Sequence, residues 1–320
     1  MANKTTIKTY EKKHSGVADF FVRLVRDKPI GLIGGIITIL FLITGIFAPL
    51  LAPYGPNVLH PLNASEGPSL KFWMGTDWLG RDVLSRVIYG ARVSLVVGLT
   101  AALIAIVVEI GIGVLSGYIG GKFDLIVQRF VDAVMCVPSL IILIVIVTIL
   151  SPGMTQIIVI LGIQMGIVGS RVIRSATIAI KENLYIQSAV VIGDSTKDVL
   201  WRHILPNILS PIIIEFSMCI PAVILTEAGL SFLGYGVPPP AASWGAMLSG
   251  SARTFMYISP WMVVFPSLAL SLVIYGVNMF GDTVRDLLDP RLKRGVGHYG
   301  LTLEKINKIK AKSNIESNIE

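Results

Sequence analysis

Residues 185–206 read Y-I-Q-S-A-V-V-I-G-D-S-T-K-D-V-L-W-R-H-I-L-P, the longest polar interruption between two strongly apolar blocks. The first half predicts a helix, because apolar residues recur at helical spacing: Ile186, Ala189, Val190 and Ile192. Gly193 should end that helix, since a glycine inside a helix costs about 1 kcal/mol relative to alanine. Asp194 or Ser195 can cap a second short helix that ends before Pro206. The stretch therefore predicts two short helices joined at a glycine.

The composition outside this stretch is that of a membrane protein. The chain has 320 residues, of which 53% are hydrophobic and 15% are charged, and its mean hydropathy is +0.73. Soluble domains carry about 25% charged residues. Long uncharged runs together with so few charges indicate a polytopic membrane protein.

Six apolar runs are candidates for crossing the bilayer. The first has 22 residues without a charge, enough for a hydrocarbon core of about 30 Å. The predicted spans are residues 30–51, 94–117, 134–150, 154–170, 208–225 and 261–280. An even number of spans places both termini on the same side of the membrane.

The distribution of basic residues predicts which side that is. Lys and Arg number 7 in residues 1–29, 2 in residues 118–132, 5 in residues 171–206 and 8 in the tail, against 5 in the two segments on the opposite side. Cytoplasmic loops carry an excess of Lys and Arg. We therefore expect the termini and residues 185–206 to be cytoplasmic.

A second informative stretch, residues 75–95, reads G-T-D-W-L-G-R-D-V-L-S-R-V-I-Y-G-A-R-V-S-L. Leu79, Val83 and Leu84 fall at helical spacing with Val87 and Ile88, opposite a polar face. The pattern predicts an amphipathic helix lying on the outer membrane surface before the second span. A purely structural role for it is an open alternative.

The motifs resemble those of one family, the permease subunits of ATP-binding-cassette importers. The coupling loop of that family reads E-A-A, then three residues, then G, then about nine residues to I-x-L-P. This chain keeps the same spacing, with Gln187-Ser188-Ala189 followed by Gly193 and by I-L-P at 204–206. Gln replaces the family's Glu and Ser replaces its Ala. An ordinary amphipathic loop helix is the alternative interpretation.

Four further strings are similar to the dipeptide, oligopeptide and nickel branch of that family, and to its C-type subunits in particular. They are residues 75–95, the string from Glu227 (E-A-G-L-S-F-L-G) that continues to V-P-P-P at 237–240, S-W-G-A-M-L at 243–248, and D-P-R-L-K-R at 289–294. The resemblance covers about residues 20–294.

The resemblance implies an all-α membrane protein with the type I importer permease fold, six transmembrane helices and both termini inside. It implies these partners: a second, B-type permease subunit, two ATP-binding subunits that hold ATP and magnesium, an extracellular solute-binding protein and the lipid bilayer of a prokaryotic cell membrane. It implies no catalytic residue, cofactor or nucleic acid for this chain. The residues expected to couple to the ATPase are Tyr185, Gln187, Ser188, Ala189, Gly193, Asp194, Arg202, His203 and Pro206.

The resemblance also divides the chain into segments. Residues 1–29 are the cytoplasmic N-terminal segment, 30–51 the first transmembrane helix, 52–92 an external loop with the amphipathic helix, and 93–283 the core permease domain. Within the core lie the coupling loop 174–206 and an external loop 229–258, and residues 284–320 form the cytoplasmic tail.

Two glutamates lie within predicted spans. A charge inside the bilayer is costly, so Glu109 and Glu215 are expected to face the bundle interior and to be functional or paired. Pro211 and Pro221 flank Glu215 and can open backbone carbonyls to a pathway. We predict that both glutamates contribute to the substrate pathway; a protonated group with a packing role is the alternative.

The sequence offers no nucleotide, metal or catalytic motif. Ser116–Phe123 approaches a P-loop, but the first glycine is Ser116 and Phe123 stands where Ser or Thr must hold magnesium. The histidines form no metal-ligand pattern. The predicted function is import of di- or oligopeptides, driven by ATP that partner subunits hydrolyse. Import of nickel or a metal chelate, a secondary transporter and a membrane-embedded enzyme are the alternatives considered.

Overall fold

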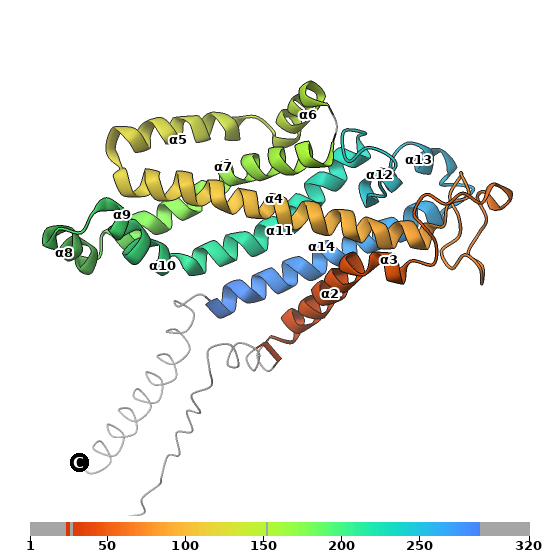
Figure 1. Cartoon of the computed structure of the whole chain (residues 1–320), viewed down its shortest axis with the longest axis horizontal. Helices are drawn as coiled ribbons and strands as arrows, with labels where there is room; N and C mark the ends of the chain where they lie inside the picture. Colours follow the sequence, from red (N-terminus) through yellow and green to blue (C-terminus); the bar gives the residue numbers. More distant parts are fainter. Residues whose placement is uncertain (1–23, 26–27, 152, 289–320) are drawn as a thin grey trace, which may run out of the picture.

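The computed structural model describes residues 24–25, 28–151 and 153–288, and in these the chain is helical (Figure 1). The longer helices are α2 (Pro29–Ile46), α4 (Val83–Ile119), α5 (Gly121–Cys136), α6 (Ser139–Leu150), α7 (Met154–Lys181), α11 (Leu209–Phe232) and α14 (Trp261–Leu288). The shorter ones are α3 (Ala48–Leu51), α8 (Leu184–Ile192), α9 (Thr196–Asp198), α10 (Leu205–Asn207), α12 (Trp244–Leu248), α13 (Ser251–Phe255), a 3₁₀ turn (Pro61–Asn63) and a π-helical turn (Val199–Ile204). An isolated bridge between Thr76 and Asp82 is the one β pairing in the described residues.

Among the described residues, five helices are long and apolar enough to cross a membrane: α2, α4, α7, α11 and α14. Helices α5 and α6 meet at 89° and make a sixth crossing only if the bent pair counts as one span. The expectation of one straight third span over residues 134–150 is therefore wrong. Pro138 cannot donate a backbone hydrogen bond and ends α5. The 12 residues of α6 reach only about 18 Å, short of a bilayer core.

The expected surface helix before the second span is not separate from that span. Residues 75–82 form a loop with Gly75 and Gly80 at positive φ, and α4 then runs unbroken for 37 residues. The Asp82 side chain starts it by accepting a hydrogen bond from the Ser85 N–H at 2.7 Å. With no proline and no αL glycine between residues 83 and 119, nothing ends the helix at the membrane surface. The predicted boundary at residue 93 thus falls within α4.

Other element bounds also extend beyond the predicted ones. Helix α7 continues to Lys181, so the first residues of the expected coupling loop 174–206 are its last turns. Helix α11 continues to Phe232, and the loop expected at 229–258 holds the short helices α12 and α13. The N-terminal segment up to residue 23, the last string of the resemblance (289–294) and nearly all of the tail lie outside the described residues.

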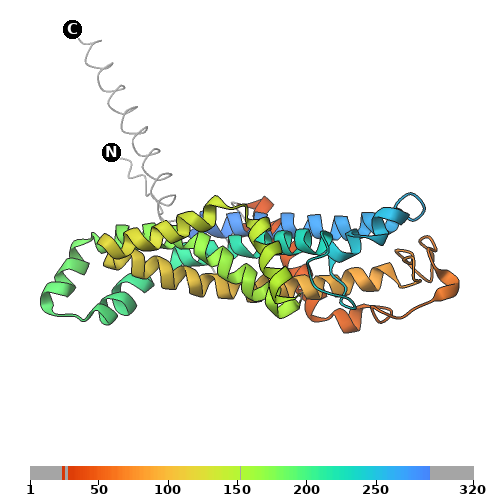
Figure 2. The ribbon, with the colours of Figure 1, turned by 90° about the horizontal axis from the view of Figure 1, so that it is seen from above.

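The bundle is elongated, and its two ends differ (Figures 1 and 2). Helices α8 to α10 lie at one end and the loop of residues 52–82 lies at the other, beside α13. We call these the coupling end and the loop end. The start of α2 and the end of α14 are neighbours, because Lys28 Nζ lies 2.6 Å from a carboxylate oxygen of Asp286. Both described chain ends point toward the coupling end (Figure 1).

Candidate functional site

The coupling segment, residues 184–206, begins with α8 and turns at Gly193. Gly193 has a φ of +107°, and its N–H and that of Asp194 bond back to the carbonyls of Val190 and Ala189. This is the left-handed cap that glycine supplies at a helix C-terminus. The prediction that the first short helix ends at this glycine is confirmed.

The second half of the segment is more continuous than predicted. Ser195 caps it, accepting a hydrogen bond from the Asp198 N–H at 3.2 Å, as expected. The chain then passes through the π-helical turn into α10, so the expected end before Pro206 is wrong. Pro206 lies in the first turn of α10, where a missing N–H costs little.

The inner face of the coupling segment is fixed to the bundle. Ile186, Val199 and Ile204 are buried in one apolar cluster with Val114 of α4 and Ile173 of α7. Each buried aliphatic side chain contributes about 1.5–3 kcal/mol. A force applied to the segment would therefore pass directly to two long helices.

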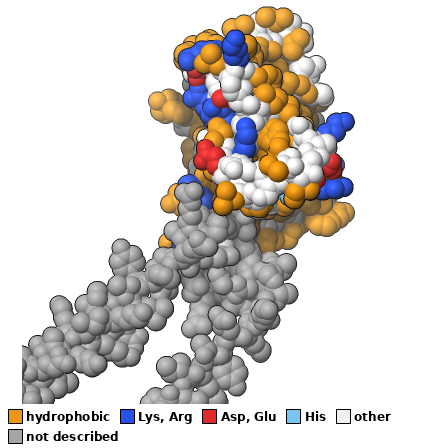
Figure 3. Space-filling model, turned by 90° about the vertical axis from the view of Figure 1, so that its left-hand side faces the viewer, with side chains coloured by type: hydrophobic (Ala, Val, Ile, Leu, Met, Phe, Trp, Pro, Cys, Tyr) orange, Lys and Arg blue, Asp and Glu red, His pale blue; other side chains and the backbone are white. Residues whose placement is uncertain are grey.

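The outer face of the segment exposes large apolar side chains, which the sequence reasoning did not single out. Leu184, Val191 and Ile192 are 79–85% exposed, and Trp201 is 72% exposed. Figure 3 views this end and shows hydrophobic side chains among basic ones. The run Val190–Ile192 was the available signal, because one helix face cannot bury three consecutive residues. Exposed apolar groups gathered at one place mark an interaction surface.

The other predicted coupling residues lie on both faces. Tyr185, Gln187 and Ser188 are exposed on α8, whereas Ala189 is buried against the bundle. His203 Nε2 lies 2.9 Å from Asp194 Oδ2, which ties the end of the segment to its turn. Arg202 is exposed and pairs with Asp198 at 3.4 Å rather than capping a helix end.

The two intramembrane glutamates lie on α4 and α11, which pack against each other. The Glu109 side chain is 2% exposed and occupies space that the absence of a side chain at Gly169 of α7 leaves open. Its Oε2 has no hydrogen-bond partner among the described residues. Glu215 is half-buried. Glu109 faces the interior as expected; a contact with substrate stays a prediction.

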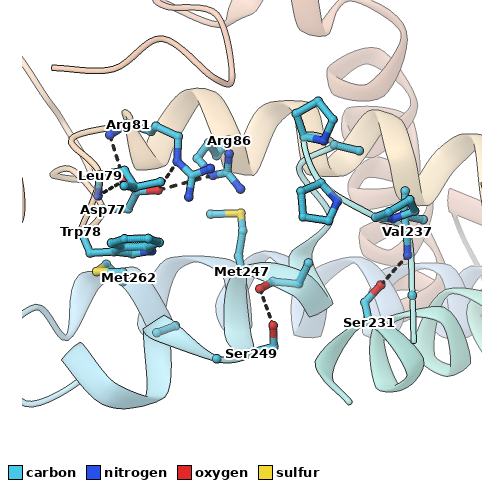
Figure 4. A pocket seen from close by; sticks show the side chains of 18 of the residues that line it. Asp77, Trp78, Leu79, Arg81, Arg86, Ser231, Val237, Met247, Ser249 and Met262 are labelled. Atoms are coloured by element: carbon cyan, nitrogen blue, oxygen red, sulfur yellow. Dashed lines mark hydrogen bonds and ion pairs between the residues drawn. The ribbon is translucent and has the colours of Figure 1, made fainter. Parts of the chain in front are cut away.

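A second site lies at the loop end, where a cavity of about 690 Å³ opens between three segments (Figure 4). Its walls come from residues 77–86, from the proline-containing loop 236–241 and from residues 246–262. The sequence reasoning assigned this region to a surface helix and so missed the cavity. The Asp77 and Arg81 side chains of its first wall are held together by a 2.6 Å contact.

The proline-containing loop is held by a buried carboxylate. Glu227 of α11 is 1% exposed and accepts a hydrogen bond from the Ser231 hydroxyl at 2.6 Å. The same hydroxyl accepts from the Val237 N–H at 3.3 Å. The string that begins at Glu227 therefore shapes the cavity wall. In the described residues no group of three or more His, Cys, Asp or Glu side chains could hold a metal ion.

An elongated helical bundle with up to six crossing helices, a rigid segment at one end and a cavity at the other has the architecture of a transport permease subunit. A family described as "Binding-protein-dependent transport system inner membrane component" matches residues 109–294, and one described as "N-terminal TM domain of oligopeptide transport permease C" matches residues 17–68. The chain belongs to the first of these families, which makes it a permease subunit of an ATP-binding-cassette importer.

Three relatives are similar over most of their length. The dipeptide transport system permease protein DppC of Alkalihalophilus pseudofirmus is 38% identical over 85% of this chain and 89% of its own. The oligopeptide transport system permease protein OppC of Bacillus subtilis is 36% identical over 84% of this chain and 88% of its own. The glutathione transport system permease protein GsiD of Pectobacterium atrosepticum is 38% identical over 86% of this chain and 91% of its own.

A solved structure supports the fold. The MetNI methionine ABC transporter, in an inward-facing conformation, has a chain that matches with a TM-score of 0.51 over 64% of this chain and 96% of that chain, at 17% identity. At this identity the likeness concerns the fold alone. The expected type I importer permease fold is confirmed.

Proposed function

We propose that this chain is one of two permease subunits through which an importer moves di- or oligopeptides into the cell. The observation that carries the proposal is the coupling segment, which is packed into α4 and α7 and exposes an apolar outer face. The named relatives transport dipeptides, oligopeptides and glutathione, so the proposed substrate is a short peptide rather than nickel or a metal chelate.

The proposed source of energy is ATP bound with magnesium by two partner subunits. Their surface receives the exposed face of α8, and Leu184, Val191 and Ile192 are its proposed contacts together with Tyr185 and Gln187. When the ATPases close, the segment moves with α4 and α7, because its inner side chains are buried between them. ATP binds the two states of the complex unequally and so shifts the transporter between outward-open and inward-open forms.

The proposed orientation places the coupling end and both termini in the cytoplasm of a prokaryotic cell. It rests on the excess of Lys and Arg in residues 1–29, 118–132, 171–206 and 281–320 over the two segments on the opposite side. The second permease subunit and the bilayer cover the apolar flanks of the bundle, and an extracellular solute-binding protein delivers the peptide to the loop end. Glu109 and Glu215 are proposed to line or gate the path near the inner third of the bundle.

The test is purification through a tag on this chain. Co-purification of ATPase subunits and a second permease, followed by ATP-dependent uptake of a labelled dipeptide or tripeptide into proteoliposomes, is the expected result. Uptake of Ni²⁺ with no uptake of peptide would show that the substrate is nickel and not a peptide. Flux through this chain alone, driven by an ion gradient without ATPase subunits, would overturn the proposal.

A further inference from the structure

One wall of the cavity at the loop end carries two arginines, Arg81 and Arg86, and one aspartate, Asp77. Asp77 accepts hydrogen bonds from the N–H groups of Leu79 and Arg81, both at 2.9 Å, and from Arg81 Nε at 2.6 Å. Arg86 lies 3.9 Å from the same carboxylate and donates to the Pro56 carbonyl at 3.0 Å. Two guanidinium groups thus face one carboxylate that already accepts three hydrogen bonds.

Arg81 keeps unused donors toward the cavity. Its Nε binds Asp77, but its two terminal nitrogens have no partner among the residues that the structure describes. Its side chain is 19% exposed, and Figure 4 shows it beside Arg86 on the wall of the cavity. A guanidinium with two free nitrogens in a partly water-excluded site suits a carboxylate, which it can bind with two parallel hydrogen bonds.

The remaining lining of the cavity is mostly apolar, with Ser231 and Ser249 among it, and the loop end exposes further large apolar side chains. Met247, Met262 and the prolines complete the walls, and Trp78 stacks on Phe255 with ring centroids 6.5 Å apart. The same end exposes further large side chains to at least 68%: Leu62, Leu70, Trp73, Tyr257 and Ile258. Large exposed apolar side chains gathered at one end mark a surface that another protein covers.

We propose that an acidic side chain of the extracellular solute-binding protein enters this cavity and pairs with Arg81 when that protein docks. The proposal rests on the proposed function, which places the loop end outside the cell. A docked protein accounts for both the recessed positive charge and the apolar rim, whereas a transported peptide would account only for the charge. The cavity is lined by the first turn of α4 and the last turn of α11, at the loop end of the bundle, and not by the middle of either helix.

The test uses the complete complex in nanodiscs and a purified solute-binding protein that stimulates ATP hydrolysis by the wild-type complex. The measured quantity is the concentration of binding protein that gives half-maximal stimulation. Arg81→Gln should raise it roughly tenfold or more, the scale for loss of a desolvated charge pair. Ala246→Phe, which adds bulk to the cavity lining while leaving Asp77 and Arg81 unsubstituted, should raise it as well.

The matched control is Lys71→Gln, which removes the same charge from an exposed residue of the same loop that does not line the cavity. It should leave the half-maximal concentration within about twofold, the size expected for an exposed charge. A Lys substitution at one acidic residue of the binding protein should reproduce the loss, and the loss should not deepen when it is combined with Arg81→Gln.

Wild-type half-maximal concentrations in both Arg81→Gln and Ala246→Phe, in complexes that retain every subunit, would overturn the docking proposal. An unchanged requirement for binding protein with a raised requirement for peptide would assign the cavity to the transported peptide and would also overturn it. A wild-type complex that retains no ATPase subunit would contradict the proposed function itself, and the docking proposal would fall with it.

Discussion

At the scale of single residues, Gly193 is the position where backbone conformation and proposed function meet. Its φ of +107° lies in the region that L-residues with a side chain rarely adopt, and a Cβ there would contact nothing within 4 Å. Any cost of substitution is therefore conformational rather than steric. It would appear as a change in the direction of α8 and not as a packing defect in the bundle.

The corresponding prediction is a graded series at this glycine. Asn adopts left-handed backbone conformations most readily after Gly, Ala costs about 1–2 kcal/mol there, and a β-branched residue is the least favourable. Gly193→Asn should retain ATPase subunits almost as wild type does, Gly193→Ala fewer, and Gly193→Val fewest or with hydrolysis uncoupled from transport. The measurement is bound ATPase and substrate-stimulated hydrolysis in each purified complex.

Gln187→Glu serves as a control in that series, because Gln187 is exposed and the substitution restores the family's usual letter. Gln187→Glu should leave the amount of bound ATPase and the substrate-stimulated hydrolysis near the wild-type values. If Gly193→Val docks the ATPase and couples as wild type does, residues 184–206 are an ordinary loop and the proposed lever is wrong.

At the scale of elements, α4 and α7 form the closest helix pair of the bundle. Gly162 and Gly166 of α7 and Gly113 and Gly117 of α4 are each four residues apart, and each faces the backbone of the other helix. A Cβ on Gly166 would lie 2.7 Å from the Ala105 carbonyl oxygen and 2.6 Å from Val108 Cβ. Small residues at this spacing let membrane helices approach closely, and van der Waals packing then holds them together.

Gly166→Ala should therefore destabilise the complex, by about 1–3 kcal/mol for an overpacked contact. The control is Gly111→Ala on α4, where an added Cβ meets nothing within 4 Å. Because alanine is the better helix former, the control should leave the stability unchanged or raise it slightly. Thermal unfolding of the purified complexes tests both; equal midpoints for the two variants would contradict close α4–α7 packing as the cause.

The bent pair α5/α6 is held to the bundle by charges as well as by packing. Asp124 of α5 accepts two hydrogen bonds from Arg174 of α7, at 2.6 and 2.5 Å, and a third from the Ser116 hydroxyl. Asp132 lies about two turns further along α5 and pairs with Arg171. These contacts hold the polar face of α5 against α4 and α7, which are apolar over most of their length.

Asp124→Asn should loosen α5, because a charge-assisted pair with Arg174 is lost and hydrogen bonds of this kind contribute roughly 1.5–3 kcal/mol. Amide hydrogen exchange over residues 121–136 should become faster, with little change in α11. Arg129→Gln, whose side chain is 74% exposed, should leave exchange in α5 near the wild-type rate. Unchanged exchange in Asp124→Asn would show that apolar packing alone positions α5.

At the scale of the whole molecule, the two ends of the bundle have opposite proposed environments. The segments that the sequence predicts to be cytoplasmic carry 22 of the 27 basic residues, and the two described ends of the chain lie together through Lys28 and Asp286. Five long helices alone would place the two ends of the chain on opposite sides of the membrane. Both ends lie on one side only if the bent pair α5/α6 is a sixth crossing.

Reporter fusions test this topology directly. Fusions at residues 60 and 245 should report the outside, and fusions at residues 125, 190 and 300 should report the cytoplasm. The fusion at residue 125 is the most informative, because it lies at the start of α5, before the bend. A cytoplasmic signal at residue 245 would remove one crossing and contradict the six-span arrangement.

The sequence by itself determined the elements whose cause is local. Uncharged runs of about 20 residues predict membrane helices wherever they occur, and Gly193 followed by Asp194 and Ser195 predicts a turn between helices, because αL geometry and capping depend on near neighbours. The order of five motifs identified the family. None of these inferences required knowledge of which helices touch.

Only the tertiary structure decided the features that depend on residues far apart in the chain. The cavity beside Arg81 combines residues 77–86, 231–241 and 246–262, which are separated in sequence. Whether Ile186 is buried and Ile192 exposed follows from where α4 and α7 lie, because both residues are equally apolar and a helix alone does not specify its contacts. Burial is a property of the packed bundle, and a linear pattern records only which residues could take part in it.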